Sequence, residues 1–239
     1  MTNLYSYSRI GQTITILLQI TKCKSMGKSP SGAFGATNGK IGNLVSYKLR
    51  GQDVTRIVGQ STKPRSLLQL AGNQRLTVVN EFLKPIKGLI NIGFKFKAQG
   101  STKHQYNIAT SYNMINAIKG EYPFLSMDYS KAKVSSGNLK PVSNLTAEID
   151  EEFLKLAWAY DKKSDFDVRN DRAMILLVFA DKSDPIYLLS GSLRSEGIQT
   201  IDVGLQMLSQ PFNLYVSFLA EDRDSVSDSQ YLYVTKSKD

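Results

Sequence analysis

The sequence predicts an α+β protein in which an N-terminal β-hairpin and two helices precede a C-terminal antiparallel β-sandwich. Three observations predict this fold class. Short apolar runs separated by turn residues fill the last hundred residues, two longer amphipathic stretches lie before them, and a hairpin pattern precedes both. With 239 residues, of which 41% are hydrophobic, the chain is long enough to bury a core without disulfides or metal ions.

The hairpin is expected near residue 50. Two runs rich in apolar and β-branched residues, 44–49 and 54–58, flank the sequence Arg50-Gly51-Gln52-Asp53, and glycine suits a tight turn between strands. Residues 29–42 come before the hairpin and hold four glycines together with serine and proline. Such a composition indicates a turn-rich leading segment.

Two helices are expected between the hairpin and the sandwich. Over residues 66–83 the apolar residues recur at spacings near three, four and seven, and Pro85 then bends or ends the helix. A second helix is expected over about residues 105–119, where Gly120 suits a C-terminal cap. An extended segment, 123–140, then leads into the sandwich.

Seven short strands in about ninety residues predict the sandwich. Alternation in the second strand directs Trp158 into the core, and Tyr215 on the sixth is a candidate for a hydroxyl bond to the backbone. Tryptophan and tyrosine in these places resemble the immunoglobulin-like fold of fibronectin type III domains, a resemblance that carries no function. The expected strands are 144–149, 153–159, 173–179, 185–189, 198–203, 212–219 and 226–234.

These patterns divide the chain into a basic α+β domain, 26–140, a β-sandwich domain, 141–239, and an extension, 1–25, that is non-native or disordered. Met26 is followed by Gly-Lys and is a second candidate start beside Met1. Residues 10–20 are apolar but interrupted by Gln and Thr, and they are too few to span a membrane. No signal-peptide cleavage site follows them, so we favour a cytoplasmic location and expect no membrane contact.

Charge is distributed unevenly along the chain. Residues 1–100 carry 15 Lys and Arg against 2 Asp and Glu, which is a net charge of +13. Residues 151–239 carry 10 against 15, which is a net charge of −5. A clustered basic half suits a polyanionic partner, whereas opposite charges on two halves also suit head-to-tail packing of subunits, or of the halves on each other.

Single His and Cys residues exclude most metal and redox centres. One Cys excludes disulfide frameworks, thiolate zinc clusters and iron–sulfur ligation, and one His excludes sites that need two imidazoles. His104 stands between Lys103 and Gln105 without a nucleophile motif, which favours a surface or capping histidine. The glycine-rich residues 32–42 lack the order of a phosphate-binding loop. We therefore expect no catalytic residue, no cofactor and no enzyme activity.

A calcium site is one hypothesis for the acidic loops. In a fibronectin-like sandwich the loops 160–172 and 220–225 emerge at the same end, and clustered carboxylate oxygens hold Ca²⁺. Lys and Arg residues interleaved in the first loop favour the alternative, which is solvated turn charges. The weak candidate ligands are Asp165, Asp167, Asp171, Asp222 and Asp224, with Glu221 beside them.

Several short motifs follow one another in the order typical of one family: 39–45 with Gly51 and Arg56, Gln74-Arg75 followed by 81–88, 92–95, 111–113 with 116–123, 128–131 with 135–139, and 226–231. Over residues 26–234 the chain resembles a Bacteroidota family of uncharacterised proteins, a domain of unknown function of the DUF6266 kind. The resemblance implies a shared fold and transfers no catalytic residue.

The function expected from the sequence is that of a non-catalytic structural or interaction protein, for example a component of a protein assembly, with a protein partner or self-association. The alternative is sequence-independent binding of nucleic acid or another polyanion through the basic N-terminal half. Tyr47 lies among the basic residues of that half, but no base-reading motif accompanies them. The candidate polyanion-binding residues are Lys40, Lys48, Arg50, Arg56, Lys63 and Arg65.

Overall fold

A computed structural model describes residues 37–59, 63–160, 170–179 and 184–235. The chain falls into two compact units that divide between Pro64 and Arg65. From the sequence we expected a domain boundary between residues 140 and 141, where the basic part ends and the sandwich begins. That boundary stays a prediction. The expected extension, 1–25, lies outside the described residues.

The first unit contains a three-stranded antiparallel sheet, with β1 (Gly39–Ile41), β2 (Leu44–Leu49) and β3 (Gln52–Ile57) in that order. The expected hairpin forms β2 and β3. Arg50 and Gly51 both have positive φ, 53° and 82°, in the two-residue turn that joins them, and such turns match the twist of the flanking strands. Strand β1 was not predicted from the sequence. It pairs with β2 through a second tight turn, which consists of Gly42 and Asn43.

The second unit begins with a helical layer. Helix α1 (Leu67–Leu83) starts at Ser66, whose side chain forms a capping box with Gln69, so the helix expected over 66–83 is confirmed. Pro85 ends it, and two short helices that the sequence did not predict follow, α2 (Lys87–Gly93) and α3 (Lys95–Ala98). Helix α4 (Gln105–Asn116) is the second expected helix, three residues shorter than predicted.

The end of α4 is followed by a small hairpin in place of continued helix. Its strands are β4 (Ile118–Lys119) and β5 (Ser126–Met127), and a 3₁₀ turn, η1 (Tyr129–Lys131), comes next. Segment 132–142 then runs to the sandwich, and its backbone bonds to both neighbouring parts of the unit: the amide of Ser136 donates to the carbonyl of Gly93 in α2, and the amide of Leu139 donates to the carbonyl of Val226 before β12.

The sandwich consists of two antiparallel sheets. One has the strand order β10-β7-β6 and the other the order β12-β11-β8-β9. All seven strands lie where the sequence predicted strands, although the last begins at Gln230 and not at Val226, because Val226 and Ser227 form isolated bridges to Leu219 and Leu139. The strands are β6 (Ser143–Asp150), β7 (Phe153–Ala159), β8 (Arg172–Phe179), β9 (Ile186–Leu188), β10 (Ile198–Asp202), β11 (Phe212–Leu219) and β12 (Gln230–Val234).

Two short helical elements complete the sandwich, a 3₁₀ turn η2 (Arg194–Glu196) before β10 and a single helical turn α6 (Leu205–Leu208) before β11. No helix among the residues that the structure describes combines the length and apolarity needed to cross a membrane.

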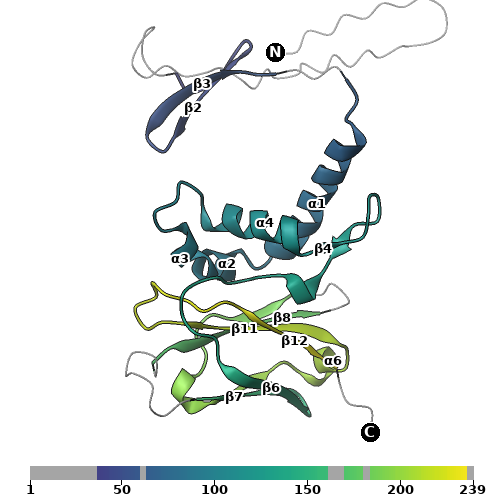
Figure 1. Cartoon of the computed structure of the whole chain (residues 1–239), viewed down its shortest axis with the longest axis vertical. Coiled ribbons are helices and arrows are strands. Elements are labelled where there is room, and N and C mark those ends of the chain that lie inside the picture. The colour runs from purple at the N-terminus through teal and green to yellow at the C-terminus, as the bar shows by residue number, and fades with distance from the viewer. Residues whose placement is uncertain (1–36, 60–62, 161–169, 180–183, 236–239) are drawn as a thin grey trace, which may run out of the picture. The chain divides into compact units, whose positions relative to one another are not determined.

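Figure 1 shows the second unit as three stacked layers: the helices, the four-stranded sheet and the three-stranded sheet. A core between the two sheets contains Trp158, as its alternation predicted, in edge-to-face contact with Phe218. A second core lies between the helices and the outer face of the four-stranded sheet, where Phe82 and Ile90 meet Leu176 and Tyr215. The four-stranded sheet is therefore covered on both faces.

Strand β11 shows the effect of this double cover. All eight of its residues are buried, although its sequence alternates as a half-exposed strand would. The Tyr215 hydroxyl donates a hydrogen bond of 2.6 Å to the carbonyl of Tyr129. The expected bond from this tyrosine to the backbone therefore exists, but its acceptor belongs to η1 beneath the helices and not to the sandwich itself.

Candidate functional site

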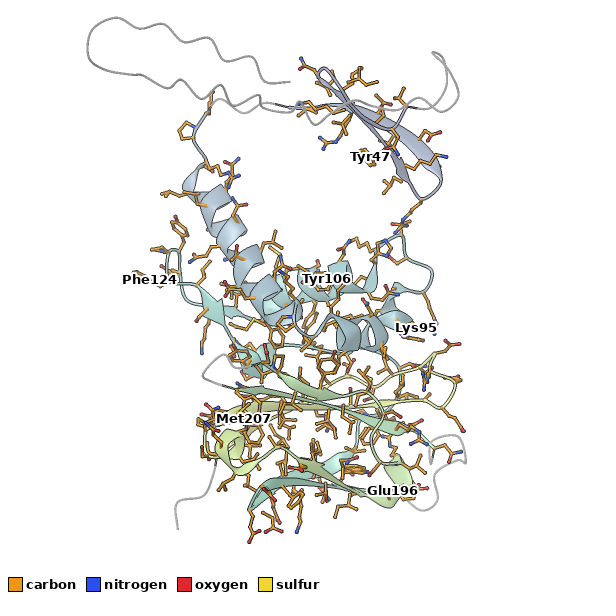
Figure 2. The ribbon with its side chains drawn as sticks, turned by 180° about the vertical axis from the view of Figure 1, so that it is seen from behind. Tyr47, Lys95, Tyr106, Phe124, Glu196 and Met207 are labelled. Carbon is orange, nitrogen blue, oxygen red and sulfur yellow. The ribbon has the colours of Figure 1, made fainter. Side chains whose placement is uncertain are left out.

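The N-terminal sheet has one face that carries two cations and an aromatic ring. Lys40, Val45 and Arg56 are register partners across the three strands, so their side chains share a face. Tyr47 and Val54 form the next same-face pair. Figure 2 shows Tyr47 on this sheet. The arrangement combines positive charge with a stackable ring.

The opposite face carries an exposed apolar rung, which consists of Ile41, Leu44 and Ile57 in register across the three strands. Their exposed fractions are 50%, 45% and 71%. Ser46 is the one buried residue among those described in this unit, and its hydroxyl bonds to the hydroxyls of Thr37 at 2.8 Å and Thr55 at 2.9 Å. Within the described residues, this sheet therefore buries hydroxyl groups and no apolar side chain.

The six cations predicted to bind a polyanion are all exposed, and the structure brings only some of them together. Lys40 and Arg56 share a rung, as described above. Lys48 is the register partner of Asp53 on the opposite face, and Arg50 occupies the turn. Lys63 and Arg65 stand on either side of the unit boundary at Pro64. Their binding of a polyanion stays a prediction.

The acidic residues predicted to bind calcium are engaged with other groups where the structure describes them. Asp171 is buried and forms an ion pair of 2.9 Å with Arg194, whose guanidinium also lies over the ring of Phe218. Asp222 accepts a hydrogen bond from the backbone of Asp224, and the carboxylate of Asp224 lies 2.6 Å from the amine of Lys95.

Asp165 and Asp167 lie outside the described residues, so the proposed set of ligands is not seen together. No group of three or more His, Cys, Asp or Glu residues with metal-binding geometry occurs in the part of the chain that the structure describes. The calcium site stays a prediction, and calorimetric titration with calcium is the measurement that decides it.

His104 is exposed and occupies the N-cap position of α4, where its side chain makes no capping bond. It borders a groove of about 630 Å³ together with Lys84 and Lys87. Among the described residues that line this groove, none is a carboxylate or a serine. The arrangement does not include the acid and nucleophile that a catalytic histidine would need.

A polar network joins two segments that are about ninety residues apart in the sequence, and it centres on Asp228. The Asp228 carboxylate lies 2.5 Å from the Lys133 amine, accepts a hydrogen bond of 2.9 Å from the Ser136 hydroxyl, and accepts another of 3.2 Å from the Gly137 amide. Burial opposes ionisation of this carboxylate, but the hydrogen bonds from Lys133 and Ser136 outweigh burial and lower the pKa of Asp228.

The network extends into α4 through Asn113. This buried side chain donates to the carbonyl of Lys133 and accepts from the amide of the same residue, both at 3.0 Å. Gly137 lies so close to Val226 that an added Cβ would sit 2.0 Å from the Val226 carbonyl oxygen. The network therefore holds the helices, segment 133–137 and the residues before β12 in one arrangement.

A family model described as a family of unknown function, DUF6266, matches residues 36–233. The chain belongs to this family. In this DUF6266 chain, the motifs 111–113, 135–139 and 226–231 that carried the resemblance are the segments that build the Asp228 network. A search among curated proteins found no match.

The sequence reasoning identified the exposed cations of the DUF6266 chain but missed the apolar rung beside them. A signal for the rung existed, because Gly42-Asn43 between apolar residues is a known hairpin turn. Placing that turn would have paired Ile41 with Leu44 and extended the sheet to three strands.

Proposed function

We propose that this DUF6266 protein is a non-catalytic structural or interaction protein, a component of a protein assembly, and that its N-terminal sheet contacts the partner. The observation that carries the proposal is the exposed rung of Ile41, Leu44 and Ile57 in a sheet whose described residues bury no apolar side chain. A sheet of three strands needs a packed hydrophobic face for stability, and exposed apolar patches mark interaction surfaces. A partner surface would supply the missing cover.

A second copy of the chain is the partner that the charges favour. The described part of the first unit carries Lys40, Lys48, Arg50, Arg56 and Lys63 against Asp53 alone. The outer face of the sheet β10-β7-β6 exposes Glu148, Asp150 and Asp202, with Lys155 as its cation. Opposite charges on two surfaces steer association and fix its register. Lys48, on the same face as the rung, and Arg50, in the turn, would meet these carboxylates if the rung docks on the acidic face of the next copy, and this docking gives a head-to-tail contact.

Size-exclusion chromatography with light scattering, over a range of protein concentrations and at two salt concentrations, tests the proposal. We expect assemblies at low salt that become smaller at high salt, because salt screens exposed charges. Replacing Ile41, Leu44 and Ile57 together by serine is expected to give a monomer with an unchanged melting temperature for the second unit. The matched control is Ile115→Ser, which removes an equally exposed isoleucine from α4 and is expected to leave assembly unchanged.

A monomer at every concentration would contradict self-association. Assembly that survives the triple substitution would show that another surface is responsible.

Binding of nucleic acid or another polyanion is the second candidate function, and the shared face of Lys40, Arg56 and Tyr47 favours it. Cations that contact phosphate and an aromatic ring that stacks on bases are the common elements of sequence-independent single-strand binding. We expect Lys40→Gln with Arg56→Gln to weaken binding of a single-stranded oligonucleotide, and Lys155→Gln to leave it unchanged. Oligonucleotide binding that does not weaken as the salt concentration rises would contradict this function.

We also propose the finer family assignments: that the sandwich is of the fibronectin type III kind and that the family belongs to Bacteroidota. Strand order supports the first, since the first, second and fifth strands form one sheet and the other four form the second. The second rests on the motif resemblance alone.

A further inference from the structure

A cavity of about 520 Å³ opens in the second unit where three distant parts of the chain meet. The C-terminal end of α1 supplies Phe82, the β4–β5 hairpin supplies Leu125 and Met127, and the end of β8 supplies Val178. Figure 2 marks this side of the unit by Phe124, in the loop before β5 and beside α1. Cavities of this volume with mainly apolar walls are typical of small-molecule sites.

Three charged side chains border the cavity, and none of them forms an ion pair or a side-chain hydrogen bond with another described residue, although Lys119 lies near enough to Asp128 to help lower the pKa of that carboxyl. Glu81, Lys119 and Asp184 are exposed, and no ion pair joins any of them to a residue that the structure describes.

The hydroxyl of Tyr129 is a fourth polar group on the cavity wall, and it also makes no hydrogen bond within the described part of the chain. Its ring is held in place by edge-to-face contact with Phe82, at a centroid distance of 5.7 Å. Burial raises the pKa of Tyr129, and the nearby charge of Glu81 raises it further.

We infer that this cavity binds a small apolar molecule that carries one ammonium group. The apolar body would displace water from Phe82, Leu125, Met127 and Val178, which is favourable in proportion to the area covered. Among the described residues that border the cavity, two carboxylates stand against the Lys119 amine, so the electrostatic balance of these groups favours a cation over an anion. The Tyr129 hydroxyl is available as a further hydrogen-bonding group. This inference does not depend on the N-terminal sheet or on assembly.

Calorimetric titration of the full chain with three eight-carbon probes tests the charge preference. The probes are octylamine, octanoate and 1-octanol, which share an apolar tail and differ in the charge of the head group. We expect octylamine at neutral pH to bind with one site per chain, to raise the melting temperature, and to bind at least tenfold more tightly than octanoate. Equal binding of octylamine and octanoate, or no binding of octylamine, would overturn the inference.

Substitutions of the charged residues that border the cavity, and of an exposed residue that lines it, test whether the probe binds in the cavity. Glu81→Gln combined with Asp184→Asn is expected to weaken octylamine binding at least tenfold and to leave 1-octanol binding unchanged. Ser126→Phe places a ring at an exposed position on the cavity lining and is expected to abolish binding of both probes. The matched control is Glu196→Gln, an exposed carboxylate on η2 at the end of the sandwich remote from the helices.

Each variant is compared with the unsubstituted chain by its melting temperature without ligand, which separates lost binding from lost folding. Unchanged octylamine binding in folded Ser126→Phe would show that the probe binds elsewhere. A loss in Glu196→Gln as large as in the double variant would show that overall charge, and not this cavity, attracts the probe.

Discussion

The N-terminal sheet and the four-stranded sheet of the sandwich carry similar alternating patterns but differ in what covers them. In the four-stranded sheet, helices pack on one face and the second sheet on the other, so that Leu214 and Tyr215, on opposite faces of β11, are both buried. In the N-terminal sheet, Leu44 and Ile57 remain exposed. The residue pattern thus determines where strands form, whereas the burial of each sheet face depends on elements that are distant in the sequence. The exposed face of the N-terminal sheet is where we expect a partner.

The largest expected difference between the two sheets is in the cost of shortening a leucine. Leu214→Ala is expected to lower the free energy of unfolding by about 3 to 4 kcal/mol, because it leaves a cavity in a packed core. Leu44→Ala is expected to lower it by less than about 0.5 kcal/mol, because Leu44 is half-exposed. Chemical denaturation of both variants measures this. Similar losses would mean that the N-terminal sheet has a cover outside the described residues.

Adding a methyl group at Gly137 tests the close contact that joins the helical layer to the sandwich. Gly137→Ala is expected to cost about 3 kcal/mol, since the new Cβ would meet a backbone oxygen that cannot move aside. Gly72→Ala is the matched control, because Gly72 lies in α1 with open space around it. That variant is expected to gain about 1 kcal/mol from helix propensity. Thermal and denaturant unfolding measure both, and a harmless Gly137→Ala would contradict the tight packing.

The Asp228 network contains an ion pair, whereas the network of Thr37, Ser46 and Thr55 in the described part of the N-terminal sheet consists of hydroxyl groups, and removing the charge of Asp228 should destabilise the second unit. Asp228→Asn is expected to lower the free energy of unfolding by about 2 kcal/mol at neutral pH, because the partners Lys133 and Ser136 lose a charged acceptor.

The same change predicts a pH dependence. Because the pKa of Asp228 is lower in the folded state, its contribution is present above the unfolded pKa of about 3.9 and is lost as pH falls through the folded pKa. The difference in stability between the unsubstituted chain and Asp228→Asn should therefore shrink below about pH 4. A difference that stays constant down to pH 2 would mean that the ionised carboxylate contributes nothing.

The smallest expected effect concerns the bond between β11 and the segment under the helices. Tyr215→Phe keeps the ring and removes the hydroxyl that bonds to the Tyr129 carbonyl, so we expect a loss of about 1 kcal/mol. Burial, together with the charges of Tyr231 and Tyr129, raises the pKa of Tyr215 far above its usual value. The folded chain should therefore lose stability as pH rises above about 10, where the unfolded tyrosine ionises, and Tyr215→Phe should lose less.

Much of the fold could be predicted because its signals are local. All seven sandwich strands, helix α1, most of α4 and the inward orientation of Trp158 follow from alternation, from helical spacing and from residues such as Ser66 and Pro85. The short helices α2, α3 and α6 were missed because four to seven residues are too few to establish a helical period.

The candidate sites were harder to predict because they depend on contacts between distant segments. The cations of the N-terminal sheet could be named from the sequence, but the shared rung of Lys40 and Arg56 requires the strand register. The cavity near Tyr129 is formed by α1, the β4–β5 hairpin and the end of β8, and no local sequence pattern predicts that these three elements contact one another. Burial of both faces of β11 was missed for the same reason.

The shared core of helices and sandwich has a consequence for synthesis on the ribosome. Helices α1 to α4 are complete before residue 120, but Tyr215 and Tyr231, which pack against their apolar side, are translated about a hundred residues later. Until those tyrosines emerge from the exit tunnel, the apolar side chains on this face of the helices have no part of the chain to pack against. We expect nascent chains stalled before β11 to recruit chaperones and released ones to fold only after translation ends.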